Sequence, residues 1–174
     1  MKSSPTSAAL RPTPDQLRDV LRYWTTGVSI VAVNHAGVLH GMTVNSFTSL
    51  SLDPPLVMVS LEKVTRTHGF VESAGLFGVS ILSEAQKELS NRFAGREIEG
   101  KDRFAGVETF TLETGSPLIY GALAYFDCRV STTHEGGTHT IFIADVLAAA
   151  VSATDSKENP LVYFNRNYRR LIDL

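Results

Sequence analysis

The sequence predicts a mainly β fold, with a closed or nearly closed antiparallel barrel and a few peripheral helices. Segments with strand-like alternation or short apolar runs dominate the chain, and the amphipathic segments that suit helices are few. Strands and helices do not alternate in the regular βαβ order that a doubly wound parallel sheet requires. An antiparallel barrel therefore fits this order of elements better than an open α/β sheet.

Length and composition predict a single domain. The chain has 174 residues, 43% of them hydrophobic, which is enough for one sizeable core. We divide it into a flexible N-terminal arm, residues 1–13, and one domain, residues 14–174. The formal net charge of −2 argues against a nucleic-acid or membrane-surface partner.

The expected compartment is the cytoplasm. No run approaches the ~18 apolar residues of a transmembrane helix, and the N-terminus lacks the apolar segment of a signal peptide. The only cysteine, Cys128, cannot form an intramolecular disulfide. It lies on an alternating apolar segment, so we expect a buried, inert thiol.

The first expected helix begins at Thr13-Pro14-Asp15-Gln16, a capping box with proline at the first helical position. Its apolar residues recur at i, i+3, i+4 and i+7, so that one stripe should pack on the core. These residues are Leu17, Val20, Leu21 and Trp24.

The first expected strand, Val28 to Asn34, is apolar with little alternation, as is typical of a strand covered on both faces. Because a small barrel would need an outer cover for such a strand, we expect a homodimer. His35-Ala36-Gly37 is an expected turn, after which the chain returns antiparallel.

The most informative segment is His40 to Leu61, which is expected to form a strand, a Pro-Pro turn and a second strand. The first of these strands carries small polar side chains on both faces. Such side chains let a flat polar ligand approach the backbone and provide hydrogen bonds for its heteroatoms. They are Thr43, Asn45, Ser46, Thr48, Ser49 and Ser51.

The next segment is a candidate anion site. Ser60 to His68 leaves a strand and enters an expected helix, Thr65 to Ala74, so that backbone N–H groups at the helix start point outward. Hydroxyls and cations stand beside them at Ser60, Lys63, Arg66 and Thr67. A phosphate group fits this place, and a solvated basic turn is the alternative.

The remaining elements follow in order. We expect a strand at Leu76 to Leu82, and a helix that opens at the capping box Ser83-x-x-Gln86 and ends before Gly95. The charged segment Arg96 to Gly115 is expected on the surface. Gly121 to Thr133 and His139 to Val151 should form a hairpin around a turn at His134 to Gly137, and Leu161 to Phe164 a last strand before a basic tail, Asn165 to Arg170.

Several catalytic motifs are absent from the sequence. It contains no G-x-G-x-x-G, no phosphate-binding loop of the Walker type and no nucleophile elbow. His134 and His139 flank the expected hairpin turn, but no third ligand accompanies them, so we expect no metal site. We assign no catalytic acid, base or nucleophile.

Three motifs, TTGVSIV, HGMTVNSFTSLSLDPPLVMVSL and HTIFIADV, resemble those of the short-chain flavin reductases. This family supplies two-component monooxygenases, styrene monooxygenase among them, and the resemblance runs from about Leu17 to Leu171. It implies an FMN-binding split β-barrel, usually a homodimer with flavin near the subunit boundary. It implies flavin contacts at Thr43, Val44, Asn45 and Ser46, and contacts on the phosphate side at Ser60, Lys63, Arg66 and Thr67.

The resemblance also points to two residues in the second half of the chain. Phe93 is expected near the flavin edge, although it also lies on the apolar stripe of its helix, and both interpretations stay open. His139 stands where the family has the histidine of a Gly-Asp-His motif that contacts the nicotinamide. Thr138 replaces the aspartate, which puts in doubt any role that needs a carboxylate beside the imidazole. His139 is then either a nicotinamide-orienting residue or an ordinary hairpin residue.

The function that the resemblance implies is an NAD(P)H-dependent flavin reductase. It would transfer a hydride from NADH or NADPH to FMN or FAD and supply reduced flavin to a partner monooxygenase. Such a reaction needs the two rings stacked and water excluded rather than a strong acid or base, which agrees with the missing catalytic dyad. The alternatives are a flavin-dependent reductase of another acceptor, such as a cobalt corrin, and a flavin-binding electron carrier without turnover.

Overall fold

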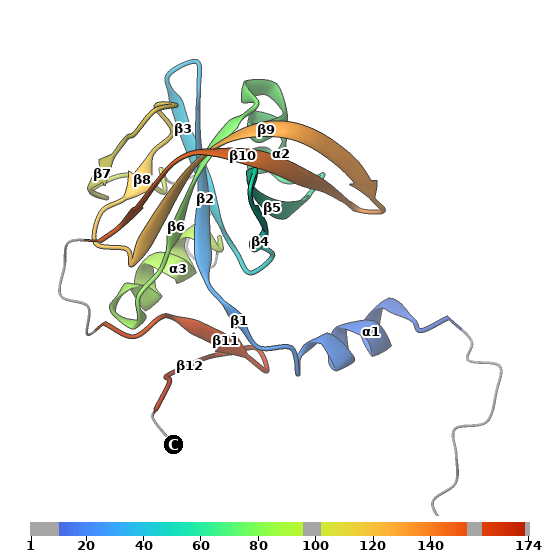
Figure 1. Cartoon of the computed structure of the whole chain (residues 1–174). Helices are drawn as coiled ribbons and strands as arrows, with labels where there is room; N and C mark the ends of the chain where they lie inside the picture. Colours follow the sequence, from blue (N-terminus) through green and yellow to red (C-terminus); the bar gives the residue numbers. More distant parts are fainter. Residues whose placement is uncertain (1–10, 96–101, 153–157, 173–174) are drawn as a thin grey trace, which may run out of the picture.

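The computed structural model describes residues 11–95, 102–152 and 158–172 (Figure 1). Strands are far more numerous than helices in it, which confirms the mainly β fold. The helices are α1 (Pro14–Leu21), α2 (Arg66–Ala74) and α3 (Lys87–Phe93), the last preceded by a 3₁₀ turn, Glu84–Gln86. The strands are β1 (Thr26–Gly27), β2 (Ser29–His35), β3 (Val38–Val44), β4 (Thr48–Leu52), β5 (Pro55–Glu62), β6 (Leu76–Ile81), β7 (Thr109–Phe110), β8 (Leu118–Ile119), β9 (Ala124–Gly136), β10 (His139–Val151), β11 (Val162–Phe164) and β12 (Asn167–Arg169). Residues 1–10 of the expected arm and 96–101 of the expected surface segment lie outside the described residues.

A seven-stranded antiparallel sheet, in the order β3-β2-β6-β9-β10-β5-β4, forms the body of the protein. The β2–β3 hairpin turns at Ala36 and Gly37, whose φ angles of 51° and 80° are those of a tight primed turn. The expected turn after His35 is therefore confirmed. Two small sheets, β1-β11-β12 and β7-β8, lie beside the main one.

The polar segment after His40 is not one strand, as the sequence predicted, but two. β3 ends at Val44 and β4 begins at Thr48, and the two strands lie at opposite edges of the main sheet. Because both halves carry strand-like residues, the sequence pattern does not reveal the interruption at Asn45–Phe47. The interruption takes the chain from one sheet edge to the other.

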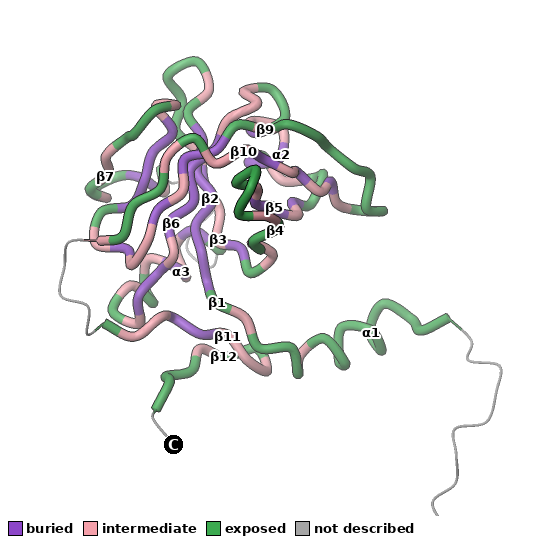
Figure 2. Tube along the Cα trace, viewed as in Figure 1, coloured by how far each residue is buried: buried purple, intermediate pink, exposed green. Residues whose placement is uncertain are grey.

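The β2 strand lies between two hydrophobic cores, and both of its faces are buried (Figure 2). Val31 and Val33 pack in the first core with residues of β5, β6 and β10, whereas Ile30 and Ala32 pack in the second with Phe93 and other residues. The strand is thus covered on both faces, as predicted. The cover comes from the same chain, so this strand is not the reason to expect a dimer.

The prediction that the apolar stripe of α1 packs on the core is wrong. The capping box forms, with the Thr13 side chain accepting from the N–H of Gln16 at 3.2 Å. However, α1 has no buried residue and extends away from the sheet (Figure 1). Val20 is 69% and Trp24 73% exposed. The helix therefore presents an apolar stripe that the described residues of the chain leave exposed.

The C-terminal half differs from the sequence prediction in three details. The β9–β10 hairpin is longer than expected, since β9 continues through Gly136 and the turn falls at Gly137 and Thr138. The expected surface segment contributes Phe104, which is 8% exposed, to the second core. The basic tail turns at Asn165 and Arg166 and forms β12 on β11.

Candidate functional site

A hollow of about 480 Å³ opens where β3 gives way to β4. The interruption contributes Asn45, Ser46 and Phe47, and β5 contributes Met58 and Ser60. The other residues around it are Trp24, Thr25, Thr26, Gly27, Ser29, Thr48 and Ile81. Hydroxyls and an amide thus stand beside apolar walls, a combination that suits a flat ligand with polar edges.

Ser46 and Ser60 join the two sides of this hollow. The Ser46 hydroxyl donates to the Ser60 carbonyl oxygen at 2.7 Å and accepts from the Ser60 N–H at 3.3 Å. Ser60 pairs with Ile141 of β10, so the contact fastens the β3–β4 interruption to β5, the strand next to the sheet edge. The sequence prediction had placed both residues at a ligand site, and the structure brings them together.

Asn45 borders three neighbouring hollows. Besides the first, it lines one of about 420 Å³ next to Trp24 and Arg166, and one of about 170 Å³ next to Tyr163. The amide is therefore accessible from several directions. No other residue that the sequence singled out borders all three.

The two remaining residues of the predicted flavin strand are positioned differently. The Thr43 hydroxyl donates to the carbonyl oxygen of Ser90 at 2.7 Å, which ties β3 to α3, and Thr43 borders only the smallest hollow. Val44 is 7% exposed and belongs to the first core. Their side chains hold the strand in place.

The turn between β5 and α2 is tied to the β9–β10 hairpin. The backbone N–H of Lys63 donates to the carbonyl oxygen of Thr138 at 3.0 Å, and the Lys63 ammonium pairs with the Glu135 carboxylate. Thr65 caps α2 by accepting from the N–H of His68 at 3.3 Å. The predicted transition from strand to helix is confirmed, and its cation already has a carboxylate partner.

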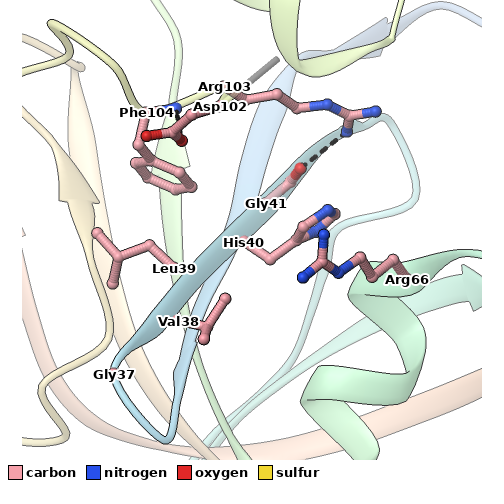
Figure 3. Close-up of a pocket in the computed structure, with 9 residues that line it drawn as sticks. All are labelled: Gly37, Val38, Leu39, His40, Gly41, Arg66, Asp102, Arg103 and Phe104. Atoms are coloured by element: carbon pink, nitrogen blue, oxygen red, sulfur yellow. Dashed lines mark hydrogen bonds between the residues drawn. The ribbon is translucent and has the colours of Figure 1, made fainter. Parts of the chain in front are cut away.

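Arg66 and Thr67 turn away from Lys63. Thr67 is buried and hydrogen-bonded to Nδ1 of His40 at 2.8 Å, and Arg66 lines a separate hollow of about 600 Å³ (Figure 3). His40 and Arg103 border the same hollow. The predicted phosphate-side residues are therefore divided between two places.

His40 is neutral at pH 7 in this environment. Burial, together with the positive charges of Arg103 and Arg66, lowers the pKa of His40 to about 4. The imidazole thus adds hydrogen-bonding capacity to this hollow without a charge of its own.

Phe93 lies in the second core. It is fully buried and meets Phe104 edge to face, with ring centroids 4.9 Å apart. Of the two interpretations that the sequence left open, its place on the apolar stripe of α3 is the one that these contacts fit.

His139 starts β10, directly after the hairpin turn. It pairs with Glu62 of β5 and with Gly136 of β9, and its Nδ1 lies 2.9 Å from the Thr138 hydroxyl. His139 opposes Glu62, two residues beyond Ser60, and alternate residues of a strand share one face, so His139 lies on the same face as Ser60, two pairs further along. The side chain is partly exposed.

The part of the chain that the structure describes gives little support for a metal site, a membrane-spanning helix or a reactive thiol. In that part, no cluster of three or more histidine, cysteine or acidic residues could hold a metal ion. Among the same residues, none of the helices has the length and hydropathy to span a bilayer. Burial and the nearby Asp127 raise the pKa of Cys128 to about 12, which confirms an inert core thiol.

Among the residues at these hollows that were not identified from the sequence as site residues are Trp24 and Arg103. Trp24 was taken for a core residue of the first helix, and Arg103 for part of a surface segment. Its helical spacing assigned Trp24 to the apolar stripe of the first helix, but α1 ends at Leu21 and Trp24 lies beyond it. No sequence signal distinguishes Arg103 from its charged neighbours.

Comparison with known proteins shows similarity over almost the whole chain. Residues 21–171 match the family model described as flavin reductase like domain. The chain is 39% identical to the flavin-dependent monooxygenase reductase subunit HsaB of Mycobacterium tuberculosis, covering 89% of this chain and 81% of that one. It is 41% identical to the NADH-dependent flavin reductase StyB of Pseudomonas fluorescens, covering 87% and 86%.

Solved structures show the same similarity at the level of the fold. The NADH:FAD oxidoreductase of Streptomyces globisporus superposes with a TM-score of 0.86 at 33% identity, covering 98% of this chain and all of that one. Another structure of that enzyme contains NAD and FAD fragments and superposes with a TM-score of 0.83 at 34% identity, covering 94% and 98%. The styrene monooxygenase flavin reductase of Pseudomonas putida superposes with a TM-score of 0.79 at 37% identity, covering 91% and 98%.

Proposed function

Since the chain belongs to the flavin reductase-like domain family, we propose that it is an NADH-dependent flavin reductase that supplies reduced flavin to a partner monooxygenase. The observation that carries the site assignment is the interruption between β3 and β4. It opens a hollow bordered by Asn45, Ser46 and Ser60, which the motif resemblance had assigned to flavin.

The flavin site that we propose is this hollow together with the start of α2. Asn45, Ser46 and the Ser60 strand provide hydrogen bonds to the polar edge of the ring, and Trp24 and Met58 provide apolar walls. Lys63 and the N-terminal turn of α2 provide charge and N–H groups for the first phosphate. A bound flavin supplies the hydride acceptor of the reaction.

His139 is proposed to orient the nicotinamide. It lies on the same sheet face as Ser60 and beyond it along the same pair of strands. We therefore place the nicotinamide ring, stacked on the flavin, next to this histidine. The Thr138 hydroxyl at Nδ1 fixes the imidazole and leaves Nε2 for a ligand carboxamide. The residues around the hollow position the two rings and exclude water, and no proton transfer by a side chain is required.

We propose FAD as the flavin and NADH as the reductant. Two relatives carry the words NADH-dependent in their names, and one of these is an FAD reductase. We also propose that flavin leaves after each turnover. All three hollows around Asn45 are open to solvent, which suits a flavin that exchanges as a substrate.

The proposed assembly is a homodimer in the cytoplasm. The reason is now the exposed apolar surface of α1 and of Trp24 just after it: Leu17, Val20, Leu21 and Trp24 are between 48% and 73% exposed. A stripe of this kind on a water-soluble chain calls for a partner surface, and a second copy of the chain supplies one.

The deciding experiment is NADH oxidation followed at 340 nm by the purified protein with and without added FAD. We expect turnover that depends on added FAD and that is slower with NADPH. Binding of FAD without NADH oxidation would instead indicate an electron carrier. Oxidation only when a cobalt corrin replaces flavin as acceptor would indicate the second alternative.

A further inference from the structure

The C-terminal hairpin, β11 and β12, lies beside the segment that leads from α1 into the main sheet. Its strand β11 pairs with β1, and the three strands form a small sheet at the base of α1 (Figure 1). The turn of this hairpin, at Asn165 and Arg166, lines the hollow of about 420 Å³ together with Trp24 and Asn45. Trp24 and Asn45 also line the hollow of about 480 Å³ that we propose for flavin, which we call the flavin hollow. The hairpin therefore borders the proposed site without being part of it.

Asn165 holds Arg22, the residue that follows α1, through two contacts. Its Oδ1 accepts from Nε of Arg22 at 2.9 Å, and its backbone N–H donates to the carbonyl oxygen of Arg22, also at 2.9 Å. The Asn167 amide in turn donates to the carbonyl oxygen of Asn165 at 2.9 Å. One contact to the side chain and one to the backbone together fix the chain at Arg22.

The backbone conformation of the turn favours asparagine at this position. The φ angle of Asn165 is 49° and that of Arg166 is 62°, both in the left-handed region. Asparagine enters this region more readily than most residues with a side chain. Glycine would enter it at no steric cost but has no amide to accept from Arg22. Asparagine at position 165 thus serves the turn and the contact at once.

Trp24 lies between two fixed points of the chain. Arg22 is held by Asn165 on one side, and Thr26 pairs with Tyr163 of β11 on the other. The indole is 73% exposed, so packing does not fix its place, and α1 offers no support because it has no buried residue. The position of the indole therefore depends on the backbone on either side of it, which the C-terminal hairpin holds at both points.

We propose that Asn165 is a positioning residue of the flavin hollow, which keeps the indole of Trp24 at the wall of that hollow by holding Arg22. The effect on flavin rests on the proposed function; the hold on Trp24 does not. An indole that is already in place offers the flavin ring an apolar contact that binding does not have to order first. Loss of the Asn165 amide should therefore weaken flavin binding and spare the step that follows it.

The first test follows Trp24 in the protein without ligand. It is the only tryptophan of the sequence, so its fluorescence anisotropy reports on this position alone. Asn165→Gly keeps the left-handed backbone and removes the amide, and it should lower the anisotropy. Asn165→Asp keeps an oxygen that accepts from Arg22 and should retain the wild-type value. An unchanged anisotropy in Asn165→Gly would overturn the proposal.

The matched control is Ala36→Gly. Ala36 has a similar φ angle, 51°, in the turn between β2 and β3, so glycine relieves the same backbone conformation without touching the C-terminal hairpin. Circular dichroism checks that both glycine variants keep the fold. The control should leave the anisotropy and the flavin kinetics unchanged. An effect as large as that of Asn165→Gly would assign the result to general loosening of turns and contradict the proposal.

The second test is steady-state kinetics with FAD as the varied substrate. Asn165→Gly should raise KM for FAD roughly three- to tenfold and change kcat less than twofold, as for loss of a contact that ground and transition states share. Arg22→Met removes the same contact from the other side and should give the same result if Asn165→Gly does not fold. The double variant should be no worse than either single one, because Asn165 acts through Arg22. Additive effects, or a lower kcat at unchanged KM, would refute the positioning role.

The positioning role and the proposed function fail in different ways. If Asn165→Gly lowers the anisotropy of Trp24 while the wild-type protein binds no flavin, the proposed function fails and the hold on Trp24 stands. If the anisotropy falls but the wild type and the variant bind FAD equally well, the flavin reductase stands and the positioning role is overturned.

Discussion

The side chain of Ser46 makes two hydrogen bonds to the backbone of Ser60, to its carbonyl oxygen at 2.7 Å and from its N–H at 3.3 Å. One hydroxyl thus takes the place of the backbone hydrogen bonds that a neighbouring strand would make to Ser60, at the point where the chain crosses from β3 to β4. The same two residues border the hollow that we propose as the flavin site, so we expect stability and flavin binding to depend on this contact together.

Replacing Ser46 by alanine should reduce both properties. The change leaves two partly buried backbone groups of Ser60 without this partner, so we expect a loss of about 1–2 kcal/mol in the free energy of unfolding. Urea denaturation measures this loss, and flavin fluorescence should show weaker FAD binding. Ser49→Ala on the exposed part of β4 is the control and should change neither. An unchanged FAD affinity in Ser46→Ala would separate the contact from the site.

Replacing His139 by alanine should affect the nicotinamide and spare the flavin. Loss of one oriented hydrogen bond of roughly 1–2 kcal/mol corresponds to about a 5–30-fold lower kcat/KM for NADH. FAD affinity should stay near the wild-type value. The control is His134→Ala, an exposed histidine on the neighbouring strand that pairs with Ile141. Kinetics like those of the wild type would leave His139 a hairpin residue.

Stability should fall between pH 6.5 and pH 4 because of His40. Its pKa is lowered in the folded protein from 6.5 to about 4, so in this range the unfolded chain binds the proton that the folded chain excludes. The contribution is complete above pH 6.5 and is lost as the pH falls toward 4. Because His40 is partly exposed, we expect on the order of 1–2 kcal/mol. Urea midpoints at several pH values should show a smaller decline in His40→Asn, and an equal decline would assign the effect to other groups.

The thiol of Cys128 should be unreactive in the folded protein. Its pKa is raised to about 12, and its side chain is fully buried, so thiolate is scarce and inaccessible at pH 8. A chromogenic disulfide reagent should react slowly in buffer and rapidly in denaturant. Fast labelling of the folded protein would contradict the buried position of this thiol.

Replacing Val20 by glutamate should dissociate the proposed dimer. Val20 is 69% exposed on the apolar stripe of α1, so the change costs the isolated helix little but places a charge in an interface with a second copy. Multi-angle light scattering at micromolar concentration should give a dimer for the wild type and a monomer for the variant. Asp15→Asn, off the apolar stripe of the same helix, should remain dimeric. A wild-type monomer would refute the dimer itself.

Local signals predicted much of the fold. The Thr13 capping box, the Ala36-Gly37 turn and the doubly buried β2 follow from short patterns whose physical causes are local or depend only on burial. The break at Asn45–Phe47 does not, because strand-like residues continue across it and the partner edge of the sheet is set by tertiary structure. The prediction for α1 was wrong for a related reason: a periodic apolar stripe predicts that one face of a helix is covered, and it does not say by which chain.

The candidate site was predicted in part. Asn45 and Ser46 were identified because small polar residues in a strand are unusual, and Ser60 because it precedes an expected helix start; the three border one hollow. Arg66 was grouped with Lys63 by its position three residues later, but the first turn of α2 rotates it toward His40 instead. Side-chain direction at a helix start cannot be read from spacing alone.

The position of β2 between the two cores has a consequence for how the protein opens. Exposing either core removes the packing from one face of this strand, so neither core can open while the other keeps its full contacts. The two cores should therefore unfold as one cooperative unit. The amide protons of Ile30 to Val33 would then exchange with solvent only through global unfolding, whereas α1, which has no buried residue, can fray without disturbing that unit.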